Sequence, residues 1–495
     1  MKKVANKLAV AVLTLFIIMS GISQADVDLE KIKKNLPKLL GANNQGMEFA
    51  LSFVPAYVDD NAPPVGVPGI YIYISSSTRT KVKVRVEKHD WEKNYQLEPN
   101  TIQDVFIPYG IAQVAAKKYY NETPEPAQVY PGGAVMVTAD APIICYGLVR
   151  YPYTSDGYLA IPIASLGKEY VVAAYNGFNN DPDSWFFTPY TAIVGAHDKT
   201  RVTFTYGGRS SGRVETIEGK ILTPGKSETK VINKGDVWLI PARGNKPDIT
   251  GSYVRADKPV ACYSGNFCAY IPYSVQACDY VIEQDMPMHV WGNKYYVTPI
   301  KGRKYNSPIR IFASQNNTTV YRNGWQDQVV TVPSKFGPEN EGWIEVRAAE
   351  GEPQAVTMLS DKRFNIVQYN PGVLDDDVDS DPFELAQTPI EQFQNQIIFN
   401  TPGIKGGFKF DVNYLNIVYQ ATESGQIPED LEIGIYSSLG ELIWSQLSGK
   451  FDGDPGYEFT DPTNPTPERK YYCKQLKLPE DGVYHVRAKD KFAAY

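Results

Sequence analysis

The sequence predicts an all-β protein of tandem immunoglobulin-sized β-sandwich repeats, about four copies, the last of them incomplete. Three observations support this fold class. Two motifs recur with a common period near 118 residues, several segments alternate apolar and polar residues as half-buried strands do, and 495 residues are enough for several domains. A period of this length fits a sandwich of about 100 residues better than a propeller blade of about 40 to 50 residues.

The first motif ends in tyrosine and occurs four times. Its copies occupy residues 137–146, 254–263, 358–369 and 486–495, and the final tyrosines are 117, 106 and 126 residues apart. The first two copies contain Ala-Asp-x-Pro, in which aspartate bonds its own backbone and proline forces the preceding residue into an extended conformation. The motif therefore predicts the tip of a β-hairpin. Because the chain stops at Tyr495, where earlier copies continue as strand, we expect the fourth copy to be incomplete.

Two further signatures run in step with the first. Thr80, Thr200 and Thr318 each open an alternating segment, at offsets of 120 and 118 residues. A glycine three residues before an aromatic residue begins the first three copies, at Gly46, Gly167 and Gly292. These signatures predict the repeat boundaries, which are 46–166, 167–291 with a cysteine loop, 292–391 and 392–495.

The amino terminus has the pattern of a secretory signal peptide. Lysines at positions 2, 3 and 7 precede an apolar run at residues 8–19, and residues 23–25, Ser-Gln-Ala, supply small residues for cleavage. We expect the signal peptide to span 1–25 and residues 26–45 to form a linker or short helix; an uncleaved anchor is the alternative. No other window approaches the length of a membrane helix. The mature protein is therefore expected to be secreted, either extracellular or at the cell surface.

Composition and charge exclude one class of partner. The net charge of −7 and the pI near 5.4 leave no basic footprint for nucleic acid. The 34 tyrosines suit half-buried strands, and they equally suit recognition surfaces. Two turn-rich segments, residues 176–190 and 451–470, combine aromatic residues with Asn, Asp, Gly and Pro; they are either recognition loops or ordinary connections.

The five cysteines are not equivalent. Cys145 and Cys262 precede the motif tyrosine and are predicted to be small buried strand residues. Cys268 and Cys278 lie ten residues apart on one loop, which predicts a disulfide in an oxidising compartment. Zinc is the rival interpretation, but no further Cys or His has ligand spacing nearby. Cys473 has no assigned partner.

One long segment resembles a known family. Residues 258–300 contain Ser264-Gly265, the pair Cys268 and Cys278, Glu283-Gln284, Pro287, Trp291-Gly292 and Tyr295. In this order they resemble the amino-terminal domain of the IgGFc-binding protein family, and the resemblance extends to residues 156–175 and 379–402, so that it covers most of the chain after residue 46. It implies a non-catalytic binding or adhesion module, here a secreted member of the bacterial type. It does not imply that this chain binds antibody.

An acidic cluster is the one candidate metal site. Asp375, Asp377, Asp379 and Asp381 alternate along a loop, and carboxylates at such positions can converge on calcium. The loop is not an EF-hand, because Ser380 replaces the required glycine and Ala386 replaces the bidentate glutamate. A solvated acidic loop is the alternative. We expect no other cofactor.

Two patterns that could indicate catalysis are weak. Residues 208–212, Gly-Arg-Ser-Ser-Gly, match a nucleophile elbow, but the residues that follow predict strands and turns instead of the required helix. The histidines have neither triad nor metal spacing; they are His89, His197, His289 and His485. The sequence therefore predicts a non-enzymatic protein that binds an extracellular protein or glycan through loops, or self-assembles. An extracellular carbohydrate-active enzyme is the alternative.

Overall fold

The computed structural model describes the chain from residue 44 onward, with gaps. The described residues are 44–56, 69–115, 126–151, 154–178, 187–207, 212–323, 329–332, 342–347, 355–402, 412–436, 441–449, 456–461 and 469–495. The predicted signal peptide and nearly all of the expected linker or short helix lie outside them. Within these residues, no helix has the length and apolar character needed to cross a bilayer.

The all-β prediction is confirmed, and the first sheet shows how the strands are connected. One long strand, β7, pairs through its first half with β1 and β3 and through its second half with β2 and β8. The outer strands β4 and β5 pair with β3 and β2. The sheet therefore curls, because β7 runs through both of its halves. The strands are β1 (Gly46–Leu51), β2 (Gly69–Ser75), β3 (Thr80–Val86), β4 (Trp91–Leu97), β5 (Ile102–Ile107), β7 (Val135–Tyr151) and β8 (Thr154–Leu159).

The second sheet repeats this connectivity around β17. Strands β9 and β11 pair with the first half of β17, and β10 and β18 with its second half. Its strands are β6 (Gln128–Tyr130), β9 (Gly167–Val171), β10 (Pro189–Gly195), β11 (Thr200–Thr205), β14 (Ser227–Ile232), β15 (Val237–Pro241), β17 (Tyr253–Ala269) and β18 (Asp279–Gln284). A small sheet beside it contains β12 (Gly212–Glu215), β13 (Ile221–Leu222) and β16 (Arg243–Gly244). Strand β6 pairs with β15, although its residues fall inside the predicted first repeat.

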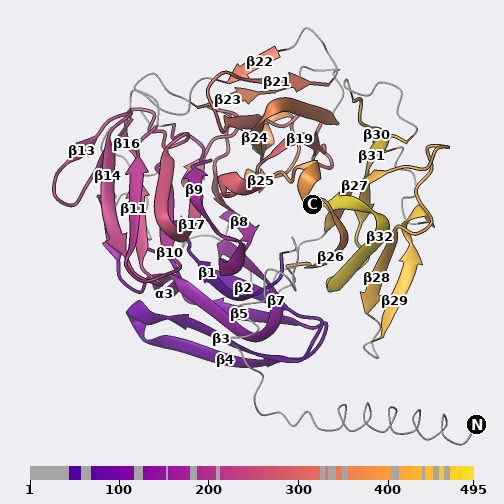
Figure 1. The fold of residues 1–495 in the computed structure, drawn as a ribbon, viewed down its shortest axis with the longest axis horizontal. Coiled ribbons are helices and arrows are strands. Elements are labelled where there is room, and N and C mark those ends of the chain that lie inside the picture. The colour runs from indigo at the N-terminus through magenta and orange to yellow at the C-terminus, as the bar shows by residue number, and fades with distance from the viewer. Residues whose placement is uncertain are drawn as a thin grey trace, which may run out of the picture. The chain divides into compact units, whose positions relative to one another are not determined.

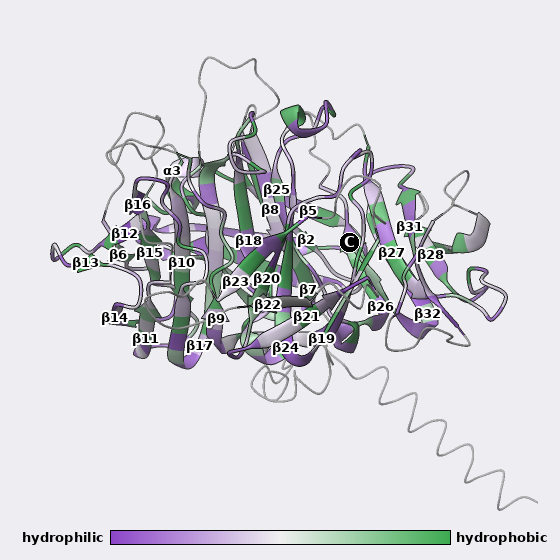
Figure 2. Cartoon of the chain, turned by 90° about the horizontal axis from the view of Figure 1, so that it is seen from above, coloured by the Kyte–Doolittle hydropathy of each residue, from purple (hydrophilic) through white to green (hydrophobic). Residues whose placement is uncertain are grey.

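The third and fourth sheets have related connectivities around β24 and β32 (Figure 1). The third contains β19 (Gly292–Val297), β20 (Ile309–Ala313), β21 (Thr318–Arg322), β22 (Val329–Val332), β23 (Trp343–Val346), β24 (Val356–Asn370) and β25 (Phe383–Ala386). The fourth contains β26 (Gln394–Asn400), β27 (Tyr414–Gln420), β28 (Glu432–Tyr436), β29 (Leu442–Gln446), β30 (Tyr457–Glu458), β31 (Tyr471–Lys477) and β32 (Val483–Ala494). Apolar segments run along the strands of each sheet (green in Figure 2).

Helical elements are short and lie in the connections. One α-helical turn, α3 (Tyr109–Ala112), follows β5. The 3₁₀ turns are η1 (Glu87–His89), η2 (Ile163–Ser165), η3 (Met288–Val290), η4 (Val373–Asp375), η5 (Ile390–Gln392) and η6 (Leu447–Gly449).

The tyrosine motif is a bend inside a long strand, so the predicted hairpin tip is wrong. Pairing of β3 with β7 ends at Ala139, and pairing of β2 with β7 begins at Ile144. Pro142 lies between them, where neither neighbour requires its missing N–H. Pro259 occupies the same place in β17, between Ala256 and Val260. The Ala-Asp-x-Pro signals mark a break in pairing instead of a chain reversal, and the strand continues through it into the other half of the sheet.

The recurring glycine takes part in a chain of hydrogen bonds at this bend. In the second sheet the Gly167 N–H donates to the Tyr170 hydroxyl at 2.8 Å, and that hydroxyl donates to the Val260 carbonyl oxygen at 2.6 Å. Gly292, Tyr295 and Phe364 form the same chain of hydrogen bonds in the third sheet. In each of the first three sheets, a proline that follows the last strand packs on the glycine that began the sheet, and a Cβ at Gly167 would lie 2.4 Å from Pro287 Cβ. Only glycine leaves room for this contact.

The motif tyrosines join successive sheets. Three of their hydroxyls donate to a backbone carbonyl oxygen of an earlier segment: Tyr263 to Ala50 at 2.8 Å, Tyr369 to Ala173 at 3.2 Å, and Tyr495 to Thr388 at 3.2 Å. The first of the series, Tyr146, packs in a cluster with Ile398 and Val483 of the fourth sheet. The four sheets are thus in contact in a closed cycle, and each motif tyrosine lies at one of the junctions.

We expect Gly167→Ala to destabilise the protein by about 1–3 kcal/mol, because the added methyl group would overlap Pro287 and push the two segments that contain these residues apart. Urea unfolding measures the change. Gly482→Ala is the matched control, since a Cβ there meets nothing within 4 Å. Equal stability of the two variants would contradict the packing role of Gly167.

Candidate functional site

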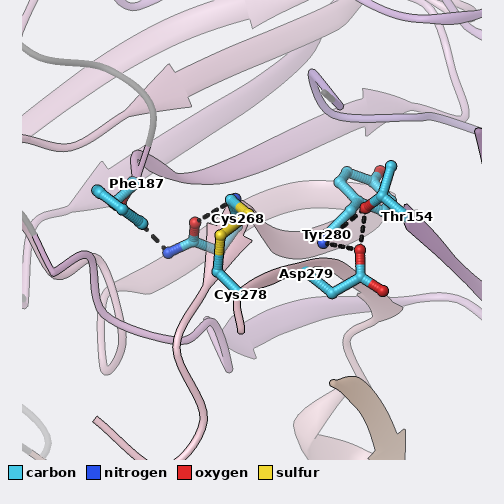
Figure 3. Close-up of a disulfide and its surroundings, with 7 residues drawn as sticks. Thr154, Phe187, Cys268, Cys278, Asp279 and Tyr280 are labelled. Atoms are coloured by element: carbon cyan, nitrogen blue, oxygen red, sulfur yellow. Dashed lines mark hydrogen bonds between the residues drawn. A yellow bond between two sulfur atoms is a disulfide. The ribbon is translucent and has the colours of Figure 1, made fainter. Parts of the chain in front are cut away.

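The predicted disulfide is present, on the loop that joins β17 to β18 (Figure 3). The sulfur atoms of Cys268 and Cys278 are 2.05 Å apart, and the Cα atoms are 5.2 Å apart. The Cys268 N–H donates to Asn266 Oδ1 at 2.9 Å. After Cys278 the chain enters β18, where the Tyr280 N–H donates to Thr154 Oγ1 of β8 at 2.9 Å. The loop is therefore anchored at both ends.

Aromatic residues cover one side of this disulfide loop. The ring of Phe178 lies 4.9 Å from the ring of Tyr270 and 5.5 Å from that of Tyr273, measured between centroids. Phe187 packs on Phe178 and on Tyr270 at 5.8 and 5.1 Å. Part of the segment 176–190, a candidate recognition loop in the sequence, thus packs on the disulfide loop; residues 179–186 lie outside the described residues.

The disulfide loop also contacts the acidic loop of the third sheet. The Gly372 N–H donates to the Ile271 carbonyl oxygen at 2.7 Å, and the Leu374 N–H donates to the Gln276 carbonyl oxygen at 3.1 Å. A Cβ at Gly372 would lie 2.7 Å from the Ala277 carbonyl oxygen. Two loops that follow equivalent strands therefore meet at the junction of the second and third sheets.

The acidic loop is engaged by arginines. Arg347 Nη1 donates to Asp375 Oδ1 at 2.9 Å, and a buried ion pair of 2.7 Å joins Arg303 to Asp376. Asp377, Asp379 and Asp381 are exposed. Across the described ranges, no group of three or more His, Cys, Asp or Glu is placed to hold a metal ion. Calcium binding by the four aspartates therefore remains a prediction, with no assembled set of ligands to support it.

A pocket of about 330 Å³ lies at the same junction. Its volume is at the lower end of the range for small-molecule sites. The second sheet and its loops contribute five lining residues and the third sheet three. The lining residues are Tyr175, Asn176, Lys246, Asp248, Tyr273, Arg310, Trp343 and Glu345.

Arg310 of β20 organises the floor of the pocket. Its guanidinium is buried and donates to Glu345 Oε2 at 2.9 Å, to Asn176 Oδ1 at 2.8 Å, to the Ala174 carbonyl oxygen at 2.6 Å and to Thr250 Oγ1 at 3.0 Å. It also lies 3.9 Å from the Tyr175 ring centroid and 4.4 Å from that of Trp343. Burial is the largest single influence and by itself lowers the pKa of Arg310, but the combined attraction of Glu345 and the other acidic groups around it outweighs burial, so the pKa is raised. The pocket floor is therefore rigid and carries a permanent, compensated charge.

The rim of the pocket is more accessible than the floor. Tyr175 and Trp343 are at most 1% exposed, whereas Lys246 is exposed and Tyr273 and Asn176 are half-buried. Lys246 Nζ lies 5.2 Å from the centroid of the Tyr273 ring. A ligand in the pocket would therefore meet a tyrosine ring, an amide, an amine and the partly exposed Glu345 carboxylate.

A second group of ionisable side chains is structural. Five buried carboxylates lie where β8, β18 and β25 meet, and burial raises the pKa of each: Asp156, Asp279, Glu283, Asp285 and Glu384. Asp156 Oδ2 accepts from the N–H groups of Ile282 and Glu384, at 2.8 and 3.2 Å. Glu283 Oε2 accepts from the Ala386 N–H at 3.2 Å. These carboxylates tie strands of three different sheets together.

The structure places the remaining predicted residues apart from the pocket. Cys145 and Cys262 are buried strand residues, as expected, and Cys473 is buried on β31. Of the histidines, three are exposed, and His485 is buried with its Nε2 2.9 Å from the Tyr436 hydroxyl. Residues 208–211 of the elbow-like motif and residues 451–455 and 462–468 of the second candidate recognition loop lie outside the described residues.

Comparison with known proteins settles the family. A family model described as IgGFc binding protein matches residues 156–495, which include β18, the disulfide loop and every residue that lines the pocket. The chain belongs to the IgGFc-binding protein family. The human IgGFc-binding protein is 23% identical to it over 274 residues, which cover 55% of this chain and 5% of the human protein. The family resemblance seen in the sequence is thereby confirmed from Asp156 onward, whereas β1 to β7 precede the matched region.

Sequence reasoning missed most of the pocket. Tyr273 and Asn176 lie in segments that stood out by composition, the cysteine loop and residues 176–190. Arg310, Trp343 and Glu345 carry no such signal, because they lie on short strands of the following sheet. A basic residue in the middle of the apolar strand sequence IRIFA was the one available sign of a buried, paired charge.

We expect the free energy of unfolding of Glu283→Gln to rise relative to that of the wild type as the pH increases from 5 to 9. Burial raises the pKa of Glu283 from an ordinary value of 4.5 to about 8, so its contribution to stability is complete below about pH 4 and is lost as the pH rises through 8. Glutamine cannot ionise and escapes this loss, a difference on the order of a few kcal/mol. Urea titrations across this range measure it.

Exposed Glu423→Gln is the matched control and should follow the wild type at every pH. If the free energy of unfolding of Glu283→Gln relative to the wild type stayed constant or fell as the pH rose, the raised pKa would be contradicted.

Replacing both Cys268 and Cys278 by serine should lower the free energy of unfolding by about 2–3 kcal/mol, since the cross-link closes a short loop in the unfolded chain. Chemical denaturation under oxidising conditions measures the loss. The buried residue Cys145, replaced by serine, provides a comparison that leaves the disulfide intact. If reducing agent destabilised the double variant as much as the wild type, the disulfide would not be the source of the effect.

Proposed function

We propose that this chain is a secreted, non-enzymatic binding protein that recognises an extracellular protein or glycan through the pocket between its second and third sheets. The pocket is the observation that carries the proposal. It combines aromatic walls, a floor built on the hydrogen-bonded Arg310 and an accessible polar rim, which is the composition of recognition sites. Family membership supports a binding role, and the disulfide and the predicted signal peptide support an oxidising, extracytoplasmic location.

We interpret the four sheets as four copies of one sandwich unit. The repeated motifs, the long bent strand in each sheet and the tyrosine at each junction support this interpretation. In such an assembly a junction between copies is a natural place for a ligand site, because two units supply different walls. The chain covers only 5% of the human relative, so the ligand in that protein's name is one candidate among several for this chain.

Carbohydrate hydrolysis is the second candidate function, because the pocket contains two carboxylates, Asp248 and Glu345. Both have structural partners. Glu345 Oε2 accepts from Arg310, and Asp248 Oδ1 accepts from the Thr250 N–H at 2.9 Å while the residue is only 2% exposed. These contacts favour binding over catalysis. Release of reducing sugar from a glycan, abolished by Asp248→Asn, would favour the hydrolase.

The purified protein should bind at least one ligand saturably when screened against a glycan array and against extracellular proteins that include the antibody Fc region. The double variant Asn176→Ala, Lys246→Glu should weaken that binding at least tenfold, because it removes one amide and reverses one charge at the rim. Surface plasmon resonance measures the affinity. Lys93→Glu, a charge reversal at another exposed lysine, on β4, is the control.

An absence of any saturable ligand, or equal loss of affinity in the control and the rim variant, would refute the proposed function.

A further inference from the structure

The charges around the pocket cancel. Two basic side chains, Lys246 and Arg310, face two acidic ones, Asp248 and Glu345. The guanidinium is already committed, since four of its five N–H groups donate to protein oxygens and its charge is paired with Glu345. Such a site offers no net attraction to a phosphate, sulfate or carboxylate, and none to a cation. It favours a neutral ligand.

The accessible wall combines one flat apolar face with closely spaced polar groups. The Tyr273 ring supplies the face, with Lys246 Nζ over the ring at 5.2 Å from its centroid, and Asn176 and Glu345 add an amide and carboxylate oxygens to the lining. A ligand that suits this wall must itself have an apolar face and several hydroxyl groups along its edge. A sugar ring has both, because its C–H groups gather on one face and its hydroxyls point outward.

The Tyr273 ring is held in place before any ligand arrives. It lies within the loop closed by the Cys268–Cys278 disulfide, and the same loop is hydrogen-bonded to the third sheet through Ile271 and Gln276. Phe178 packs on Tyr273 from within the second sheet's loops. A ring that is already immobilised loses little conformational entropy when a ligand stacks on it.

We propose that the junction pocket binds a neutral sugar residue of an extracellular glycan, stacked on Tyr273 and hydrogen-bonded by Asn176, Lys246 and Glu345. This rests on the proposed function and narrows it to one ligand class. The pocket admits one or two sugar units, in keeping with its volume of about 330 Å³. The disulfide loop then contributes to ligand specificity as well as to stability, since it carries Tyr273, on which the sugar stacks.

The test uses the full purified protein on an array of neutral glycans and their sialylated and sulfated counterparts, followed by calorimetry with the best neutral disaccharide. Tyr273→Ala should reduce affinity at least tenfold, whereas Tyr273→Phe, which keeps the ring, should stay within about threefold of the wild type. Tyr321→Ala, another partly exposed tyrosine that does not line the pocket, should bind as the wild type does. Thermal unfolding of each variant verifies that it is folded.

The outcomes separate the two proposals. Loss of neutral-glycan binding in Tyr273→Ala, with retention in Tyr273→Phe and Tyr321→Ala, supports the sugar site. Preference for the sialylated or sulfated forms, or full binding by Tyr273→Ala, overturns it. A protein ligand that competes for the pocket while no glycan binds overturns the sugar site and leaves the proposed function standing, whereas no ligand of either kind overturns both.

Discussion

The bend in each long strand is the constraint on which the rest of the structure depends. Because β17 pairs with β9 and β11 before the bend and with β10 and β18 after it, this one strand belongs to both halves of the curled sheet. Proline can occupy the bend because no ladder hydrogen bond is needed there, and the glycine–tyrosine pair bonds the backbone groups that the bend would otherwise leave unpaired. The motif tyrosine follows within a few residues and reaches the neighbouring sheet.

This arrangement also explains where the pocket forms. The second half of the long strand leads directly into the connection that carries the disulfide loop in the second sheet and the acidic loop in the third. When the motif tyrosine Tyr369 brings the two sheets together, these loops meet and Arg310 is enclosed between Tyr175 and Trp343. An arginine buried at such a junction costs less than an isolated charge, because every side of it is paired or stacked. The site is a consequence of how the sheets join.

Much of the fold, but little of the candidate site, could be predicted from the sequence. Alternation in residues 200–206 and the paired cysteines each report on neighbours close along the chain, and the structure agrees with them. The number of repeat copies stays a prediction. The hairpin prediction failed because Ala-Asp-x-Pro reports only that pairing is interrupted. Whether the chain then reverses or continues depends on strands such as β2 and β3, more than 50 residues away.

By itself, the sequence determined the strand class, the disulfide and the family, since these depend on local periodicity, on characteristic motifs and on the oxidation of two cysteines ten residues apart. Only the tertiary structure decided that the turn-like motif is a bend, that Arg303 and Arg347 pair with two aspartates of the acidic loop, and that a pocket exists. The physical reason is common to all three. Each is a relation between side chains or strands brought together by sheet packing, and no local pattern in the chain encodes which partner lies across a junction.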